Sequence, residues 1–248
     1  MAHPNLKIRA VIFDVYATLL EVGPAPADAD ERWVRLFADF LSAPPPFSRA
    51  DFAVRSGQII AARHAEVKAR GIPWPEILWP EILLEVLPAV KRLGLGEFTQ
   101  FITRHMELGR TLRLAGGAGP CLKMLRTKRC ALGIASNAQA YTLGELSAAL
   151  AGEALDLDLF PLGLCFWSFL NGFSKPDPHV FRILTTRLRQ RGIRPEETLM
   201  VGDRADNDVE PARKFGWQAW QIAKSGSPGD GDWKALRTHL EQVVAAAD

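Results

Sequence analysis

Polar residues of four kinds stand in this chain in an order that suits nucleophilic chemistry on an anionic substrate. They are Asp14, the pair Ser136 and Asn137, Lys175, and an acidic cluster that includes Asp203 and Asp208. A carboxylate can attack an electrophilic centre, while a hydroxyl and an ammonium can stabilise negative charge on the substrate. Two residues after Asp14, where a general acid would be useful, the chain has Tyr16.

Short apolar runs alternate with helical patterns in the second half of the chain, which predicts βαβ units and a mainly parallel sheet. We expect strands at 130–135, 162–167, 198–202 and 217–222, with helices at 138–150, 178–191 and 208–215 and a last helix starting near Trp233. The apolar run that precedes Asp14 predicts a central strand of the same sheet. Because ligands of open α/β sheets gather at the carboxyl ends of the strands, we expect the polar groups to converge there.

Residues 21–114 have helical patterns and no clear strand. A first helix carries Trp33 and can be capped by Asp28 or Asp30, and Ser48 is well placed to cap a second helix. Further helices are expected at 76–93 and 97–109, although Pro80 and Pro88 disfavour the first of these. The fold prediction is therefore α/β, with a doubly wound, Rossmann-like sheet core and a smaller all-helical domain. The core comprises residues 1–20 and 115–248, and the helical domain comprises residues 21–114.

The composition is that of an ordinary globular protein of 248 residues. Lys and Arg number 30 against 28 Asp and Glu, without a long block of one sign, which argues against nucleic acid as a partner. The N-terminus lacks the long apolar segment of a signal peptide or membrane span. Three cysteines without CxxC spacing predict reduced thiols and a cytoplasmic protein. The expected partner is a small anionic molecule, and the oligomeric state, monomer or homodimer, stays open.

Four sequence motifs carry a resemblance to a known family over essentially the whole chain. The motifs FDVYATLL, GIASN, SKPDPHVF and VGDRADND, in this order, resemble those of the haloacid dehalogenase-like hydrolase superfamily. The helical segment inserted after the first motif resembles the cap domain that this superfamily places between its first two motifs.

The resemblance implies a catalytic role for each matching residue. Asp14 would be the nucleophile and would form an aspartyl intermediate, and Ser136 would donate a hydrogen bond to a transferring phosphoryl oxygen. Lys175 would neutralise charge on the nucleophile and on the phosphoryl group. Asn137 could bond either to the backbone or to the substrate.

The resemblance also implies a magnesium site. Asp203 would hold Mg²⁺ together with the Asp14 carboxylate and the backbone carbonyl of Tyr16, because carboxylates, a carbonyl and waters suit this ion. Asp208 would orient a metal-bound water or Lys175.

Tyr16 departs from the phosphatase pattern, in which a second aspartate protonates the leaving group and activates water. A phenol, with a pKa of about 10, is a poor base at neutral pH. In the haloacid dehalogenases proper a tyrosine is familiar here, because a halide leaves without a proton. Those dehalogenases need no metal and usually lack the aspartate that this chain has at Asp203. Tyr16 therefore favours a dehalogenase, whereas Asp203 favours a metal-dependent phosphatase.

Three hypotheses follow. The first is a Mg²⁺-dependent phosphohydrolase whose substrate has a good leaving group. The second is a metal-independent 2-haloacid dehalogenase, for which Arg32 and Arg35 are candidate ligands of the acid, although arginines on a helix surface are usually solvated. The third is a metabolite-binding protein with little turnover. Candidate substrate-lining residues of the helical segment are Trp33, Arg63, His64, Trp74 and Trp79, of which the tryptophans more often pack between helices and His64 is more often solvated.

Overall fold

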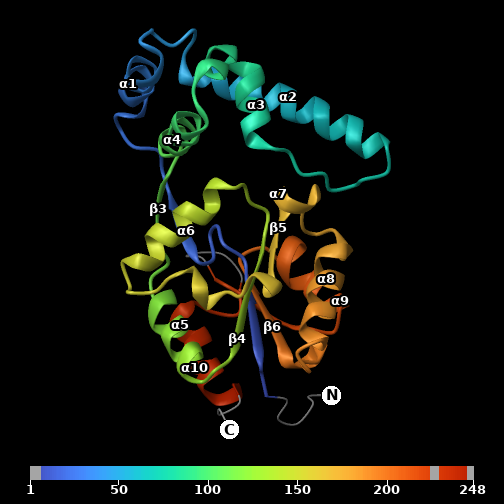
Figure 1. Ribbon diagram of the computed structural model, residues 1–248. Coiled ribbons are helices and arrows are strands. Elements are labelled where there is room, and N and C mark those ends of the chain that lie inside the picture. The colour runs from blue at the N-terminus through green and yellow to red at the C-terminus, as the bar shows by residue number, and fades with distance from the viewer. Residues whose placement is uncertain (1–6, 224–228, 245–248) are drawn as a thin grey trace.

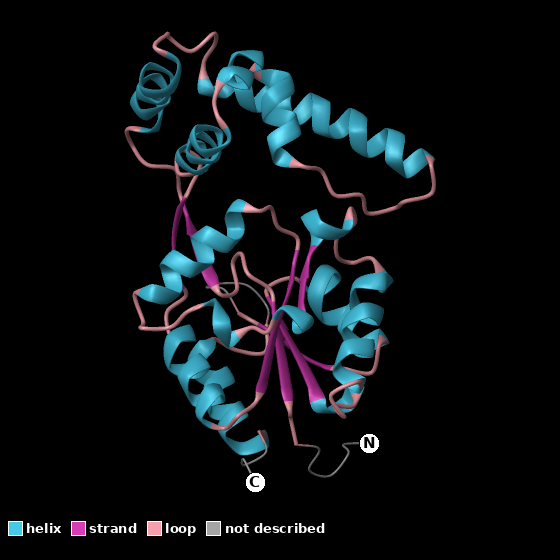
Figure 2. Cartoon of the chain, viewed as in Figure 1, coloured by secondary structure: helices cyan, strands magenta, loops and turns pink. Residues whose placement is uncertain are grey.

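A parallel β-sheet forms the centre of the molecule (Figures 1 and 2). The computed structural model describes residues 7–223 and 229–244. Its five-stranded sheet has the order β5-β4-β1-β6-β7, and every neighbouring pair is parallel. The strands are β1 (Ala10–Phe13), β4 (Ala131–Ser136), β5 (Cys165–Trp167), β6 (Thr198–Gly202) and β7 (Gln218–Gln221). The predicted parallel sheet, with the strand before Asp14 at its centre, is confirmed.

Both faces of the sheet are covered by helices, because its strands are apolar on both sides. In β1, Val11 and Phe13 belong to one core cluster, whereas Ala10 and Ile12 belong to the other, and all four are fully buried. Such continuous burial is typical of the central strand of a parallel sheet. Helices α5 (Ala118–Thr127), α6 (Tyr141–Ala151) and α10 (Trp233–Val243) pack on the first face, and α8 (Pro178–Arg189) and α9 (Glu210–Lys214) pack on the second (Figure 1). The sheet is therefore doubly wound, as predicted.

Of the two helix caps predicted from the sequence, the one at Ser48 is present. The Ser48 hydroxyl accepts a hydrogen bond from the Asp51 amide at 3.0 Å, and Asp177 caps α8 by accepting from the His179 amide at 2.8 Å. Asp28 occupies the capping position of α1 (Ala29–Leu41) but makes no capping bond with its side chain. Its carboxylate instead contacts Arg32 at 2.8 Å. An ion pair has thus replaced the expected cap.

Helices α1, α2 (Arg49–Ala69), α3 (Trp79–Val86) and α4 (Leu95–Met106) gather around a hydrophobic cluster of their own. This group, called here the upper helical region, lies beyond the carboxyl ends of the sheet strands (Figure 1). The helix expected at 76–93 is shorter than predicted. Pro80 stands in the first turn of α3, where its missing amide hydrogen costs nothing, and a separate 3₁₀ turn begins at Pro88.

Two short strands, missed by the sequence reading, connect the upper helical region to the core. β2 (Leu20–Gly23) pairs in antiparallel register with β3 (Thr111–Leu114). The expectation that no strand occurs between residue 20 and about residue 130 was wrong. Each strand has only four residues, and their pairing joins segments about ninety residues apart, so no local pattern marks them.

Two further sequence predictions concern cysteines and membrane segments. Cys121, Cys130 and Cys165 are free thiols, as expected, and all three are buried. Among the residues that the structure describes, none of the helices has the length and apolar character needed to cross a bilayer. The cytoplasmic location stays a prediction.

Candidate active site

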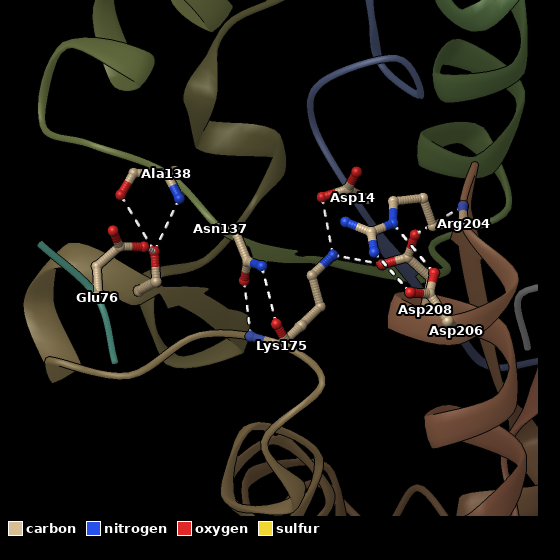
Figure 3. Close-up of polar contacts among 9 residues, drawn as sticks. Asp14, Glu76, Asn137, Ala138, Lys175, Arg204, Asp206 and Asp208 are labelled. Atoms are coloured by element: carbon tan, nitrogen blue, oxygen red, sulfur yellow. Dashed lines mark hydrogen bonds and ion pairs between the residues drawn. The ribbon is translucent and has the colours of Figure 1, made fainter. Parts of the chain in front are cut away.

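Residues from three parts of the chain meet around a buried ammonium at the carboxyl ends of the strands. Asp14 directly follows β1, and its Oδ1 lies 2.8 Å from Nζ of Lys175. The same Nζ lies 2.5 Å from Oδ1 of Asp208 (Figure 3). The Lys175 side chain has no exposed surface. The predicted convergence of these three residues is therefore present in the structure.

Burial and charge act against each other in this cluster. Burial, with a smaller contribution from the neighbouring Asp208, raises the pKa of Asp14 to about 6, although Lys175 acts in the opposite direction. Burial also acts to lower the pKa of Lys175, but the two carboxylates outweigh it and hold that pKa above its usual value. Lys175 therefore remains a cation in this cluster and favours the ionised form of Asp14 at neutral pH.

Asn137 binds the backbone of Lys175 with both ends of its side-chain amide. Its Nδ2 donates to the Lys175 carbonyl at 2.9 Å, and its Oδ1 accepts from the Lys175 amide at 2.7 Å. The sequence left open whether Asn137 bonds to backbone or to substrate, and the structure shows the backbone bonds. We call this pair of bonds the Asn137–Lys175 clamp.

The hydroxyl of Ser136 is buried without a hydrogen-bond partner among the described residues. Ser136 ends β4 and is fully buried. Leaving a buried polar group unpaired costs about 1–3 kcal/mol. A substrate oxygen near the ends of the strands could satisfy this hydroxyl.

Three carboxylates lie close enough together to share a cation. Asp14, Asp203 and Asp208 each offer an oxygen, and these oxygens all lie within 4.8 Å of one another. Oxygen donors of this kind are those that Mg²⁺ prefers, and the raised pKa of Asp14 reflects in part the repulsion that a cation would relieve. The residues present therefore fit the expected metal.

The second carboxylate oxygen of Asp208 is hydrogen-bonded to the backbone. Its Oδ2 accepts from the Arg204 amide at 3.1 Å, while its Oδ1 contacts Lys175. At Gly202 a Cβ atom would lie 2.4 Å from the Asp208 side chain, so only glycine allows this close approach. Of the two sequence-derived roles of Asp208, the orientation of Lys175 has direct contacts in the structure.

Tyr16 takes part in a second polar cluster that the sequence reading did not foresee. Its hydroxyl lies 2.5 Å from Glu145 Oε2 and 2.7 Å from Thr142 Oγ1, and it accepts from Arg110 at 3.0 Å. The Arg110 guanidinium also pairs with Glu145 at 2.9 Å and lies 4.5 Å from the centre of the Tyr16 ring. Arg110 is far from Tyr16 in sequence. The available signal was the i, i+3 spacing of Thr142 and Glu145, which places both on one face of α6.

Burial raises the pKa of the Tyr16 phenol well above its usual value, and the hydrogen bond to Glu145 raises it further, although the Arg110 charge opposes both. The phenol therefore keeps its proton at neutral pH. It is a poorer base than the aspartate whose place it takes.

The arginines singled out from the sequence form ion pairs of their own. Arg32 and Arg35 both pair with Asp28, and their side chains are 45% and 59% exposed, so they form no buried acid pocket. Arg63 binds Glu81 and Glu85 by its two terminal nitrogens.

The aromatic candidates, three tryptophans and His64, lie in different surroundings. Trp33 and Trp79 pack in the upper helical region, around the ring of His105, as expected for tryptophans between helices. Trp74 is 38% exposed. His64, expected in solvent, is half-buried and lines a surface pocket, and its Nε2 is covered.

The four motifs and the strand-end site agree with a comparison of the sequence with known families. The family of haloacid dehalogenase-like hydrolases matches residues 8–216. The chain belongs to this family. No curated protein matches the sequence significantly.

Solved structures of similar fold include members with different chemistries. A phosphatase of the haloacid dehalogenase-like (HAD) type from Thermococcus onnurineus is 22% identical, with a TM-score of 0.56. The match covers 96% of this chain and 99% of that one. A 2-haloacid dehalogenase from Pseudomonas syringae is 20% identical, with a TM-score of 0.60 and coverage of 95% and 99%. The HAD hydrolase YfnB from Bacillus subtilis, bound to magnesium, is 21% identical, with a TM-score of 0.57 and the same coverage. At these identities the likeness shows the shared fold.

Proposed function

We propose that this HAD-like hydrolase is a Mg²⁺-dependent phosphohydrolase acting on a small phosphorylated metabolite with a good leaving group. The observation that carries the proposal is the trio of carboxylates from Asp14, Asp203 and Asp208, gathered within 4.8 Å beside a buried lysine. A carbon–halogen reaction has no need of a third carboxylate at Asp203, whereas phosphoryl transfer uses a cation held by such groups.

The side chains then divide the work of phosphoryl transfer. An oxygen of Asp14 forms a bond to phosphorus as the bond to the leaving group breaks. Water then attacks the phosphorus of this aspartyl phosphate, the bond to Asp14 breaks, and phosphate is released. Lys175 keeps Asp14 ionised through its 2.8 Å contact and is itself positioned by the Asn137–Lys175 clamp. The unpaired hydroxyl of Ser136 donates a hydrogen bond to an oxygen of the transferring group.

Asp14, Asp203 and the backbone carbonyl of Tyr16 would hold the Mg²⁺ ion, while Asp208 orients Lys175. When bound, the ion supplies positive charge against the negative charge of the phosphoryl oxygens. The magnesium bound to YfnB, which has the same fold, supports this assignment.

Tyr16 limits the class of substrate. Its hydroxyl is engaged by Glu145 and Thr142 and its pKa is raised, so it is a poor proton donor and a poor base. General acid–base catalysis commonly contributes about 10²–10⁴-fold in rate. Acyl phosphates, aryl phosphates and anhydrides depart with little protonation, so they lose the least when this help is absent.

The proposal is tested by hydrolysis of acetyl phosphate, p-nitrophenyl phosphate and a simple alkyl phosphate, each with Mg²⁺ and with EDTA. We expect Mg²⁺-dependent release of phosphate from the first two, much slower release from the third, and no turnover by the Asp14→Asn variant. Equal rates for alkyl and aryl phosphates would contradict the leaving-group argument. Turnover that EDTA leaves unchanged would contradict the metal site.

Replacement of Tyr16 by aspartate is a sharper test. Tyr16→Asp should raise turnover of the alkyl phosphate by about 10²-fold, because the new carboxyl can protonate a poor leaving group. The matched control is Tyr16→Phe, which removes the hydroxyl without adding an acid and should bring no such gain. A gain in both variants would show that relief of packing, rather than proton transfer, is responsible.

A 2-haloacid dehalogenase is the second candidate, favoured by Tyr16 and by the dehalogenases among the proteins of similar fold. It predicts halide release from 2-chloropropionate that is unaffected by EDTA. If neither phosphate nor halide is released, while calorimetry shows binding of inorganic phosphate, a metabolite-binding role with little turnover is supported instead.

A further inference from the structure

The segment 74–79, which connects α2 to α3 in the upper helical region, lies against the core beside Lys175. The Glu76 amide donates to the Gly172 carbonyl at 3.0 Å, and the Ser174 amide donates to the Trp74 carbonyl at 2.9 Å. These bonds pair the segment, in antiparallel fashion, with the residues that directly precede Lys175. We call residues 74–79 the docking segment.

The docking segment also binds the loop that follows β4. The side chain of Gln139 accepts from the Trp79 amide at 2.8 Å and donates to the Ile77 carbonyl at 2.7 Å. Gln139 is 8% exposed. Its amide is therefore used at both ends by the docking segment, only two residues from Asn137.

Ser168 links Glu76 to the same loop. Ser168 begins the short helix α7 (Ser168–Asn171) and is fully buried. Its Oγ lies 2.5 Å from Glu76 Oε2, 2.8 Å from the Ala138 amide and 3.1 Å from the Ala138 carbonyl oxygen. A hydroxyl has a single proton, so Ser168 can donate either to Glu76 or to the Ala138 carbonyl. When Glu76 is present, the Ser168 hydroxyl can donate to the Glu76 carboxylate while it accepts from the Ala138 amide. When Glu76 is absent, its remaining acceptor is the Ala138 carbonyl oxygen.

Both loops that the docking segment contacts carry a half of the Asn137–Lys175 clamp. Residues 137–139 supply the Asn137 side chain, and residues 172–175 supply the Lys175 backbone to which it binds. Figure 3 shows the resulting arrangement, from Glu76 through Ala138 and Asn137 to Lys175. The position of the Lys175 ammonium thus depends on two loops, and both loops contact the docking segment.

We propose that Glu76 and Gln139 are positioning residues: docking of the segment 74–79 fixes both loops and so places the Lys175 ammonium between Asp14 and Asp208. The inference rests on the proposed function for its kinetic readout alone. Because Lys175 acts on charge that develops during the reaction, loss of docking should lower kcat more than it raises KM. Substrate turnover would then depend on contact between the upper helical region and the core.

The experiment compares Glu76→Ala and Gln139→Ala with Glu81→Ala. Glu81 belongs to the first turn of α3 and pairs with Arg63 at the surface, so Glu81→Ala is a matched control. Hydrogen exchange is measured by mass spectrometry on the peptides covering 170–177 and 131–140. Steady-state kinetics are measured with acetyl phosphate, and thermal melting verifies that each variant is folded.

We expect both test variants to exchange these amides at least about tenfold faster. Each variant loses one or more side-chain hydrogen bonds, and a factor of ten corresponds to roughly 1.4 kcal/mol, about the net contribution of a single bond. Their kcat should fall about tenfold with little change of KM, whereas the control should match the wild type. Unchanged exchange at 170–177 in both folded test variants would overturn the proposal. If the wild type releases no phosphate, the proposed function fails, but the exchange comparison still decides whether the docking segment supports Lys175.

Discussion

Two cations, Lys175 and Arg110, each lie between oxygen atoms in this protein, but their surroundings differ. Lys175 is enclosed, with no exposed side-chain surface. Of its carboxylate partners, Asp14 directly follows β1, and Asp208 lies in the π-helical turn after β6. Arg110 is 21% exposed, directly precedes β3, and binds Glu145 of α6 and the Tyr16 hydroxyl. The first cluster lies within the core, whereas the second joins the core to the ribbon that leads into the upper helical region.

The difference shows how burial changes the function of an ion pair. A buried charge that loses its partner cannot be rescued by solvent, so the Lys175 cluster must remain complete. A partly exposed cluster is screened by water and tolerates change better. The core cluster is therefore suited to chemistry, and the Arg110 cluster to fixing Tyr16 and the chain that enters the ribbon.

The largest expected effect is that of Lys175→Met. This substitution leaves Asp14 and Asp208 buried without their cation, so the free energy of unfolding should fall by about 3–5 kcal/mol in metal-free buffer. Urea denaturation followed by circular dichroism measures it. The double variant Lys175→Met, Asp208→Asn removes one of the stranded charges and should recover part of the loss. No recovery would mean that packing, rather than charge, holds this cluster together.

Arg110→Met should have a smaller effect. It removes two contacts to Glu145 and the guanidinium over the Tyr16 ring, but water reaches the site, so we expect a loss of about 1–2 kcal/mol. The same urea titration measures it. A loss equal to that of Lys175→Met would contradict the distinction between the two clusters.

Tyr16→Phe should be milder still, at about 1 kcal/mol, because Arg110 and Glu145 remain paired when the hydroxyl is removed. In a double-mutant cycle with Thr142→Val the two losses should not add, since both residues share one hydrogen bond. Additive losses would show that the bond contributes nothing.

The stability of the unmutated protein at alkaline pH tests the burial of its tyrosines. The chain has two tyrosines, and burial raises the pKa of Tyr16 above its usual value and that of Tyr141 to about 12. Between about pH 10, where tyrosines of the unfolded chain ionise, and these higher values, the folded state keeps protons that the unfolded state loses. Stability should therefore fall as the pH rises above about 10. Absorbance at the tyrosinate band should stay low in the folded protein at pH 10.5 and appear on unfolding, and early appearance would contradict the enclosure of Tyr16.

The sequence was most informative about the strands of the sheet and the polar residues that follow them. The apolar run before Asp14 predicted a central strand, and the runs before Ser136 and Asp203 predicted two further strands, which the structure places on either side of it. Once those strands are parallel and adjacent, their following residues must meet at one edge. Arg110 and Glu145 lie at no such place, so their contact with Tyr16 had no local signal.

The sequence by itself determined the parallel sheet, the family and the chemical types gathered at the strand ends, because apolar periodicity and motif order are local properties of the chain. Only the tertiary structure decided how those groups are held. It placed the Asn137 amide on the Lys175 backbone, the Tyr16 hydroxyl on Glu145, and the segment 74–79 on the loops beside the site. Each of these contacts joins segments that are distant in sequence. Such a contact stabilises the protein only when the folding of the whole chain has buried both partners next to each other.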